Sequence, residues 1–250
     1  MLLDLHDKIS IKNISKNKDE IKFIGKFKKK ISSKNNSIVK SMNVLRRYNF
    51  ISKSKKYKIT INKKIPVFAG LGGGTSNAVF LIKYFLKDKI NEKLLKIFEK
   101  EIGSDFRLFF YRHSFQKNLK KILRLKQQYN LFFILVCPNI SCSTREIYSK
   151  VKKYNLPIKN DLLKIRSKNL YLQYLKKKTN DLQTIVEKKY PEIKKILNLI
   201  KIQKNCLFSR MTGSGSVCFG VFLDKSSAKL SLSVIQKKIP NYYCMMAKSI

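Results

Sequence analysis

The sequence is poor in the residues that build metal centres and disulfide frameworks. It contains two histidines, His6 and His113, and five cysteines with no Cys-x-x-Cys pair. A zinc site needs clustered Cys and His ligands, and a disulfide framework usually has an even number of cysteines. We therefore expect neither a bound structural metal nor disulfides, and we interpret the cysteines as reduced, mostly buried thiols.

Long apolar runs and a basic N-terminus are missing as well. No stretch approaches the roughly 20 apolar residues of a membrane-spanning helix. Asp4 and Asp7 stand where a secretory signal would carry lysines before a longer apolar segment. These features predict a cytoplasmic protein without an export signal and without a membrane partner.

Acidic residues are scarce, and this scarcity raises the question of a nucleic-acid partner. The chain has 15 acidic against 55 basic residues, a formal net charge of +40. Such a balance suits a polyanion, but the lysines occur in every segment and arginine is rare, unlike the Arg-rich and aromatic patches of RNA-binding modules. Dispersed surface lysine is the preferred interpretation, and a basic RNA-binding protein stays the alternative. A positive surface would still attract a phosphate-bearing substrate.

Glycine is also scarce, and its distribution is informative. Of nine glycines, four lie between residues 70 and 74. Glycine is needed where φ must be positive or where backbone must approach a ligand. A β-branched run at 59–61 precedes this segment, and apolar residues at helical spacing follow from Ala78. A glycine-rich turn that leads into a helix N-terminus is a binding site for an anion such as phosphate.

The glycine loop, residues 65–78, differs from two common nucleotide-binding loops. The P-loop pattern requires a lysine after its last glycine, and the dinucleotide fingerprint requires a third glycine; Thr75 stands at both positions. An ordinary turn capped by Thr75 or Ser76 at the helix start would not need three consecutive glycines. A phosphate site of another kind is therefore the preferred interpretation.

The pattern of apolar residues predicts a mixed α/β (α+β) chain of two domains, residues 1–128 and 129–250, with the boundary just before an unbroken apolar strand. The expected strands are two within 8–24, then 59–65, 131–136, 217–222 and 242–247. The expected helices begin at 38, 75, 91, 144, 181, 191 and 226, with the cluster Asn35-Asn36-Ser37, Asn91, and Ser143 or Thr144 as caps. Residues 155–180 are polar and rich in lysine.

Asp105 is the candidate general base. It follows Gly103 at the expected end of the helix over 91–100 and precedes the apolar run 106–110. Partial burial at such a place could tune the pKa of its carboxyl for proton transfer. Ser104 or Asp105 could equally serve as a helix cap, since both residue types favour that position.

The loop from Pro66 to Ala78 resembles the phosphate-loop motif of the GHMP small-molecule kinases. Further segments match that family in the same order: Leu2-Asp4-Leu5-Asp7-Ile9-Ile11, Asn36-Ser37-Ile38-Val39, Gly103-Ser104-Asp105, Pro138-Asn139-Ile140-Ser141 with Ser143-Thr144, and Met211-Thr212-Gly213-Ser214-Gly215. The ordered set is most similar to the member that acts on a cytidine diphosphate-linked sugar alcohol, CDP-methylerythritol, in isoprenoid precursor synthesis. A homoserine or mevalonate type is the next alternative.

The resemblance implies an N-terminal domain like the second domain of ribosomal protein S5 and a ferredoxin-like C-terminal domain, in a monomer or homodimer. It implies ATP and Mg²⁺ as cofactors, with Asp105 accepting the proton of the substrate's 2-hydroxyl. The residues that it assigns to ATP are Pro66, Ala69, Gly70, Leu71, Gly72, Gly73, Gly74, Thr75, Ser76 and Asn77. The residues that it assigns to substrate are Thr144, Tyr148, Thr212, Gly213, Ser214 and Gly215.

Two of these assignments have alternatives. Tyr148 could stack on cytosine or could be a buried core residue. The loop at Gly213 and Gly215 could approach the substrate's diphosphate or could support the glycine loop.

The sequence departs from the family pattern in three places. The family begins further upstream, with a Pro-x-Lys-x-Asn strand and an Asp-Gly-Tyr-His turn; neither is present here, which we interpret as a late start or a fragment, with loss of activity as the alternative. Arg107 replaces a proline. Residues 118–121 replace a Gly-x-Gly-Glu segment. As printed, we expect a poor kinase with an unpaired sheet edge.

Overall fold

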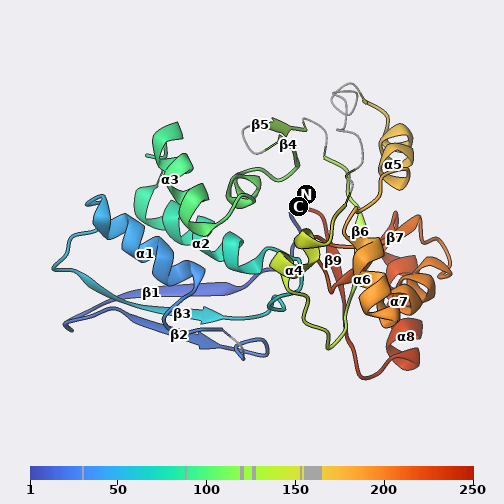
Figure 1. Ribbon diagram of the computed structural model, residues 1–250, viewed down its shortest axis with the longest axis horizontal. Helices are drawn as coiled ribbons and strands as arrows, with labels where there is room; N and C mark the ends of the chain where they lie inside the picture. The colour runs from blue at the N-terminus through green and yellow to red at the C-terminus, as the bar shows by residue number, and fades with distance from the viewer. Residues whose placement is uncertain (30, 88, 119–120, 126–127, 153, 155–164) are drawn as a thin grey trace. The chain divides into compact units, whose positions relative to one another are not determined.

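The computed structural model describes residues 1–29, 31–87, 89–118, 121–125, 128–152, 154 and 165–250 (Figure 1). The chain divides into two compact units. The N-terminal unit comprises Leu5–Val67 and Gly72–Ile122, and the C-terminal unit comprises Met1–Asp4, Phe68–Leu71 and Leu123–Ile250. The glycine loop is thus divided between the units: residues 68–71 belong to the C-terminal unit, and residues 65–67 and 72–78 belong to the N-terminal unit. The expected boundary at 128/129 would have left the whole loop in the first domain.

The N-terminal unit contains a three-stranded sheet in the order β1-β3-β2. Its strands are β1 (Lys8–Ile14), β2 (Glu20–Ile24) and β3 (Lys56–Asn62). β1 is antiparallel and β2 parallel to β3, so the first two strands do not form a hairpin but lie on either side of the third. The strand expected over 59–65 begins earlier, at Lys56, and ends at Asn62.

Three helices cover one face of this sheet (Figure 1). They are α1 (Ser37–Arg47), α2 (Gly73–Leu86) and α3 (Glu92–Ile102). Asn91 is the expected cap of α3, and Asn36 is the member of the expected cluster 35–37 that caps α1; each side-chain oxygen accepts from backbone N–H groups at 3.0 Å. Such caps satisfy backbone donors that a helix leaves without partners. Ile59 and Ile61 of β3 are fully buried beneath these helices.

A short 3₁₀ helix follows α3 and carries the candidate base at its start. This helix, η1 (Phe106–Phe110), begins after Gly103, the C-cap of α3, which has φ 151°. Two short strands follow, β4 (Ser114–Asn118) and β5 (Lys121–Arg124). The departure noted at residues 118–121 falls partly on 119 and 120, which lie outside the described residues.

The C-terminal unit is built on an antiparallel four-stranded sheet in the order β7-β8-β6-β9. Its strands are β6 (Phe132–Cys137), β7 (Phe208–Met211), β8 (Cys218–Phe222) and β9 (Tyr243–Lys248). Its helices are α4 (Thr144–Ser149), α5 (Lys168–Lys176), α6 (Gln183–Lys189), α7 (Pro191–Lys201) and α8 (Lys225–Lys238). β7 and α5 were not foreseen from the sequence, and residues 155–164 lie outside the described part.

Helices α6, α7 and α8 contribute to the apolar core on this sheet. At Gly220 of β8 a Cβ would lie 2.3 Å from Cγ2 of Ile200, so only glycine lets α7 pack this closely on the strand. The cysteines are free; four are buried and Cys206 is half-buried. Burial raises the pKa of the Cys206 thiol to about 11 and that of Cys137 to about 12, which suits unreactive core thiols.

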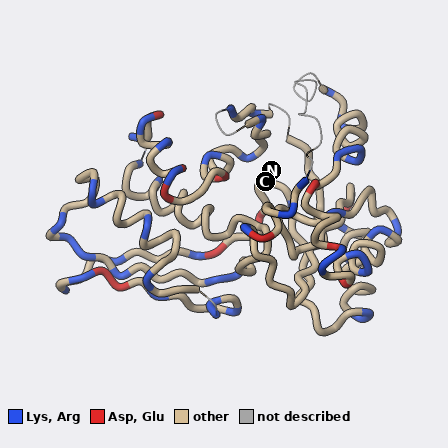
Figure 2. Tube along the Cα trace, in the orientation of Figure 1, with Lys and Arg blue, Asp and Glu red and all other residues tan. Residues whose placement is uncertain are grey.

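The basic residues are spread along the whole described chain (Figure 2). Among the described residues, no helix has the length and apolar character to cross a membrane. In that same part of the chain, no three His, Cys, Asp or Glu side chains gather into a potential metal site.

Candidate active site

The glycine loop of the N-terminal unit ends in the first turn of α2. Gly72 is the N-cap in a left-handed conformation, with φ 64°, and Ser76 N donates the first helical hydrogen bond to Gly72 O at 2.9 Å. The amides of Gly73, Gly74 and Thr75 therefore lie where a helix offers no acceptor and where its dipole is positive. Thr75 and Ser76 lie in the first turn, as expected, but the helix begins two residues earlier than predicted, and neither residue caps it because the N-cap is Gly72.

The three consecutive glycines have different structural causes. A Cβ at Gly72 would lie 2.4 Å from Cζ of Phe109, and one at Gly73 would lie 2.8 Å from Cγ2 of Ile65. Gly74 is exposed, and a Cβ there would meet only Oγ of Ser37, at an ordinary 3.5 Å. Packing thus accounts for the first two glycines. The third leaves bare backbone beside the free amides, as a closely approaching ligand would require.

Asp105 lies beside this first turn. Its Oδ1 accepts a hydrogen bond from Oγ1 of Thr75 at 3.1 Å, and its Oδ2 lies 3.5 Å from the position that a Cβ on Gly72 would take. Although Asp105 occupies the N-cap position of η1, its side chain makes no capping hydrogen bond. The alternative that it serves only as a cap is therefore wrong. Burial raises the pKa of its carboxyl, and the hydrogen bond from Thr75 opposes part of that rise.

The buried carboxylate of Asp7 anchors the chain before and after the loop, a role that its place in a family-like segment did not reveal. The Asp7 side chain is fully buried and pairs with Lys63, which is also buried. It further accepts hydrogen bonds from the backbone N–H groups of Lys64 (2.7 Å) and Ile65 (2.8 Å) and from Nδ2 of Asn77 (2.8 Å). Asp7 thus ties the end of β3 to α2. The sequence could not show these contacts, because the partners lie more than fifty residues away along the chain.

Three residues that the resemblance assigns to ATP are buried and do not face a ligand. Asn77 is 5% exposed and directs its amide to Asp7. Pro66 and Ala69 are buried as well. The three residues shape the loop from within, whereas the exposed face of its N-terminal-unit part consists of the backbone around Gly74.

In the C-terminal unit, the residues assigned to substrate fall into two groups. Thr144, at the start of α4, and Ser214 are joined by a hydrogen bond of 2.9 Å between their hydroxyls. Ser143 is the cap of α4. Tyr148 on the same helix is 51% exposed. The alternative that Tyr148 is a core residue is therefore wrong, and its ring face is available for stacking.

The second glycine-rich loop, residues 212–215, packs against the first part of the glycine loop, which belongs to the same unit. Oγ1 of Thr212 donates to Gly70 O at 2.8 Å, and a Cβ on Gly70 would lie 2.3 Å from Thr212 O. Nδ2 of Asn180 donates to Gly213 O at 2.8 Å, and Gly215 N donates to Thr212 O at 2.9 Å. These bonds favour the supporting role over direct contact with a diphosphate.

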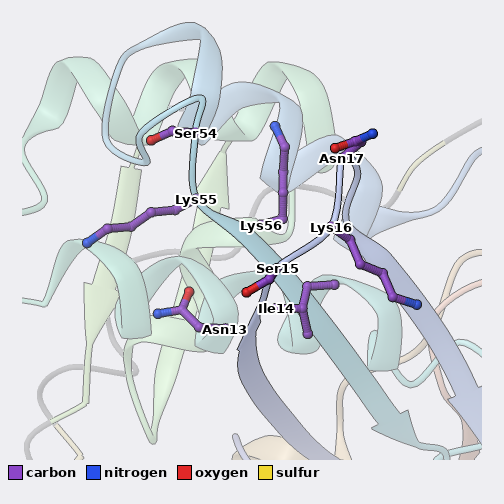
Figure 3. A pocket seen from close by; sticks show the side chains of 8 residues that line it. All are labelled: Asn13, Ile14, Ser15, Lys16, Asn17, Ser54, Lys55 and Lys56. Atoms are coloured by element: carbon purple, nitrogen blue, oxygen red, sulfur yellow. The ribbon is translucent and has the colours of Figure 1, made fainter.

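A separate hollow of about 400 Å³ lies between the β1–β2 connection and the chain before β3, and it does not include these residues. Three lysines line it, Lys16, Lys55 and Lys56, but their side chains point in different directions (Figure 3). Lys16 is paired with Glu20. The hollow offers neither a carboxylate nor converging cations, so it is not the site that the sequence predicts.

Comparison with known families decides the relationship. The family model for the GHMP kinase N-terminal domain matches residues 36–105, and the model for the GHMP kinase C-terminal domain matches residues 161–241. Together they cover more than half of the chain. The chain belongs to the GHMP kinase family. The first match includes both the glycine loop and Asp105, so the small-molecule kinase expected from the sequence is confirmed at the level of the family.

Individual relatives of this GHMP kinase point to one member. The chain is 36% identical to 4-diphosphocytidyl-2-C-methyl-D-erythritol kinase of Pelagibacter ubique (strain HTCC1062), over 99% of this chain and 88% of that protein. It is 31% identical to the enzyme of that name from Wolbachia pipientis wMel, over 96% and 83% of the two chains. The resemblance inferred from the ordered motifs is therefore confirmed.

Solved structures agree on the fold. A crystal structure of 4-(cytidine 5'-diphospho)-2C-methyl-D-erythritol kinase matches with a TM-score of 0.75 at 16% identity, covering 98% of this chain and 87% of that one. Homoserine kinase from Cytophaga hutchinsonii ATCC 33406 matches with a TM-score of 0.73 at 15% identity, covering 99% and 87%. At such identities the likeness concerns the fold, and it confirms the expected GHMP kinase architecture.

Proposed function

We propose that this GHMP kinase transfers the γ-phosphoryl group of ATP to the 2-hydroxyl of 4-diphosphocytidyl-2-C-methyl-D-erythritol, a step of the non-mevalonate route to isoprenoid precursors. The relatives that carry this name match this chain over most of their own length, and they support the choice of substrate. One observation carries the chemistry: the half-buried carboxylate of Asp105 is hydrogen-bonded to Thr75 within the first turn of α2.

The first turn of α2 fits the phosphates of ATP. The amides of Gly73, Gly74 and Thr75 would donate to phosphate oxygens, and the exposed backbone at Gly74 leaves room for them. Mg²⁺ would neutralise charge on the phosphates during transfer.

Asp105 would accept the proton of the attacking hydroxyl. As the substrate oxygen bonds to the γ-phosphorus, the bond from that phosphorus to the bridging oxygen breaks, ADP leaves and the hydroxyl proton passes to the carboxylate. A pKa raised by burial makes Asp105 a stronger base than an exposed aspartate, while Thr75 holds one of its oxygens in place. Positioning of this kind supplies much of the catalysis in phosphoryl transfer.

The residues of the C-terminal unit would recognise the rest of the substrate. The exposed ring of Tyr148 suits stacking on cytosine, and the hydroxyl of Thr144, oriented by Ser214, would line the same subsite. The 212–215 loop would act through Gly70, whose carbonyl it holds.

Purified full-length gene product tests the proposal directly. With ATP and Mg²⁺ we expect turnover of 4-diphosphocytidyl-2-C-methyl-D-erythritol, with product identified by mass, and a higher melting temperature in the presence of both ligands. Homoserine and mevalonate serve as competing acceptors, and turnover of either in preference would overturn the choice of substrate. Salt-sensitive binding to RNA without any kinase activity would favour the RNA-binding alternative.

A further inference from the structure

Arg107, two residues after Asp105, forms two ion pairs with one helix. Its Nε donates to Oε1 of Glu99 at 2.6 Å and its Nη1 donates to Oε2 of Glu92 at 2.8 Å. Both glutamates belong to α3. The guanidinium of η1 therefore bridges two turns of the neighbouring helix, with the fork geometry that makes arginine suited to fixed orientations.

The two ion pairs differ in exposure. The side chains of Arg107 and Glu99 are each 16% exposed, whereas that of Glu92 is 73% exposed. Exposed pairs contribute little to stability, but a partly buried pair is screened less and its loss leaves a desolvated charge without a partner. The contact with Glu99 is thus the stronger tether.

Dispersed surface charge does not account for this arrangement. The chain contains only seven glutamates against 55 basic residues. Two of the seven contact the same arginine, although lysines surround them in the sequence. A specific use of Arg107 explains the arrangement better.

The segment that Arg107 holds is short and carries the proposed base. η1 has five residues, and a 3₁₀ helix of that length is poorly stabilised by its own hydrogen bonds. Its orientation therefore depends on docking. Phe106 supplies one contact, since its buried ring stacks on Phe98 of α3 with 5.7 Å between centroids. Arg107 supplies the polar contact at the next residue.

We propose that Arg107 is a positioning residue: its ion pairs with Glu99 and Glu92 fix η1 on α3 and thereby keep the carboxylate of Asp105 against Thr75. The inference rests on the proposed role of Asp105 as the base. The side chain of Arg107 bonds to Glu99 and Glu92, not to Asp105 or the glycine loop. Its effect on the reaction therefore passes through the orientation of η1.

Kinetics of Arg107→Met test the proposal, with Arg47→Met as the matched control. Arg47 also pairs with α3, through Glu101 at 3.2 Å, but both side chains are more exposed and Arg47 belongs to α1, not to η1. We expect Arg107→Met to lower kcat by about 10- to 100-fold, as small misplacements of reacting groups do. KM for ATP is expected to stay within about twofold, since the α2 amides are unchanged. A kcat equal to that of Arg47→Met would overturn the proposal.

A double-mutant cycle identifies the partner. Glu99→Gln should lower kcat nearly as much as Arg107→Met, and the double variant should be no worse than either single one, because both remove the same interaction. Fully additive losses would mean that the two residues act separately and would contradict the tether. Should Arg107→Met fail to fold, Arg107→Lys keeps the charge but not the fork, and an intermediate loss of kcat is expected.

A titration that needs no turnover separates this inference from the proposed function. The ¹³C carboxyl signal of Asp105, assigned with Asp105→Asn, reports its pKa in the wild-type protein and in both arginine variants. A loosened η1 should hydrate the carboxyl and lower its pKa toward the ordinary value in Arg107→Met only. If the wild-type protein phosphorylates no acceptor, the proposed function fails, and an unchanged pKa in Arg107→Met then overturns the positioning role while a lowered pKa supports it.

Discussion

The two glycine-rich loops of this GHMP kinase use glycine for different purposes. At Gly72 to Gly74 the chain enters a long helix, and the last glycine is exposed beside amides without helical acceptors. At Gly213 and Gly215 the chain turns between two strands, with φ of 51° and 87°; the amide of Asn180 donates to Gly213 O, and the Ser214 hydroxyl is bonded to that of Thr144. The first loop offers free donors, whereas the second has turned most of its polar groups toward protein.

The difference shows that glycine count alone does not identify a binding loop. A binding loop also needs donors without partners and a nearby group that does chemistry. The first loop has both, with the raised-pKa carboxyl of Asp105 next to it. The second contributes by holding Gly70, the first glycine of the glycine loop.

Asp105→Asn should produce the largest effect. The amide keeps the shape and a hydrogen-bond acceptor for Thr75 but cannot take a proton, so we expect kcat to fall by about 10²- to 10⁴-fold. The melting temperature should not decrease. Steady-state kinetics and a thermal denaturation curve check both statements, and full activity in the variant would remove Asp105 from the reaction.

The same variant has a pH signature. Burial raises the pKa of Asp105 in the folded protein, so as pH rises the carboxyl loses its proton in the unfolded chain first. The free energy of unfolding therefore decreases between the ordinary pKa of an aspartate and the raised pKa of the folded state. Asp105→Asn should therefore be more stable than the wild type at neutral pH, with the advantage vanishing in acid. Wild-type activity should likewise be lost in acid, below the raised pKa. Urea unfolding at several pH values measures the difference in stability.

Gly70→Ala should break the contact between the two loops. Its φ of 70° costs an alanine about 1–2 kcal/mol, and a Cβ 2.3 Å from Thr212 O adds about 1–3 kcal/mol of crowding. Chemical denaturation should show this loss of stability. If the variant were as stable as the wild type, the close approach of the loops would be wrong.

Thr212→Val tests the hydroxyl part of the same contact. Removing the donor to Gly70 O should destabilise the fold by about 0.5–1.5 kcal/mol. We also expect KM for ATP to rise, because this hydrogen bond helps to fix the backbone of the glycine loop. Thr144→Val is the control, since it removes the hydroxyl pair with Ser214 but not the contact with Gly70.

Gly74→Ala should have the smallest effect on stability. It tests directly whether the glycine loop, unlike the 212–215 loop, keeps a glycine for a ligand. Alanine inside a helix is favoured over glycine by roughly 0.5–1 kcal/mol, and its methyl group meets only Ser37 at 3.5 Å. We expect a fold at least as stable as the wild type together with weaker ATP binding, measured by calorimetry. Unchanged ATP affinity would show that phosphates do not approach Gly74.

Much of the fold could be predicted because its signals are local. The caps Asn36 and Asn91, the stop at Gly103 and the helices beginning near Asp181 and Pro191 follow from residue type and spacing. Strand β7 was missed because four residues carry too little alternation to be recognised. Helix α5 was missed because residues 155–180 were interpreted together as a polar, lysine-rich stretch, although α5 itself carries Tyr171, Leu172 and Leu175 at helical spacing.

In the candidate site, too, some residues could be predicted from the sequence and others could not. Asp105 and the glycine loop are visible in sequence, since each has a local reason for its residue type. The role of Arg107 is not: in sequence it is a departure from a motif, and only its partners on α3 give it a purpose.

The sequence by itself determined where the chain turns, where its helices begin and where backbone must be bare, because these requirements act on a few neighbouring residues. Only the tertiary structure decided which side chains meet. Asp7 pairs with Lys63 across 56 positions, and Thr212 holds Gly70 across 142. Such partners are chosen by packing of distant segments and by the cost of burying a polar group alone, and neither leaves a periodic trace in the chain.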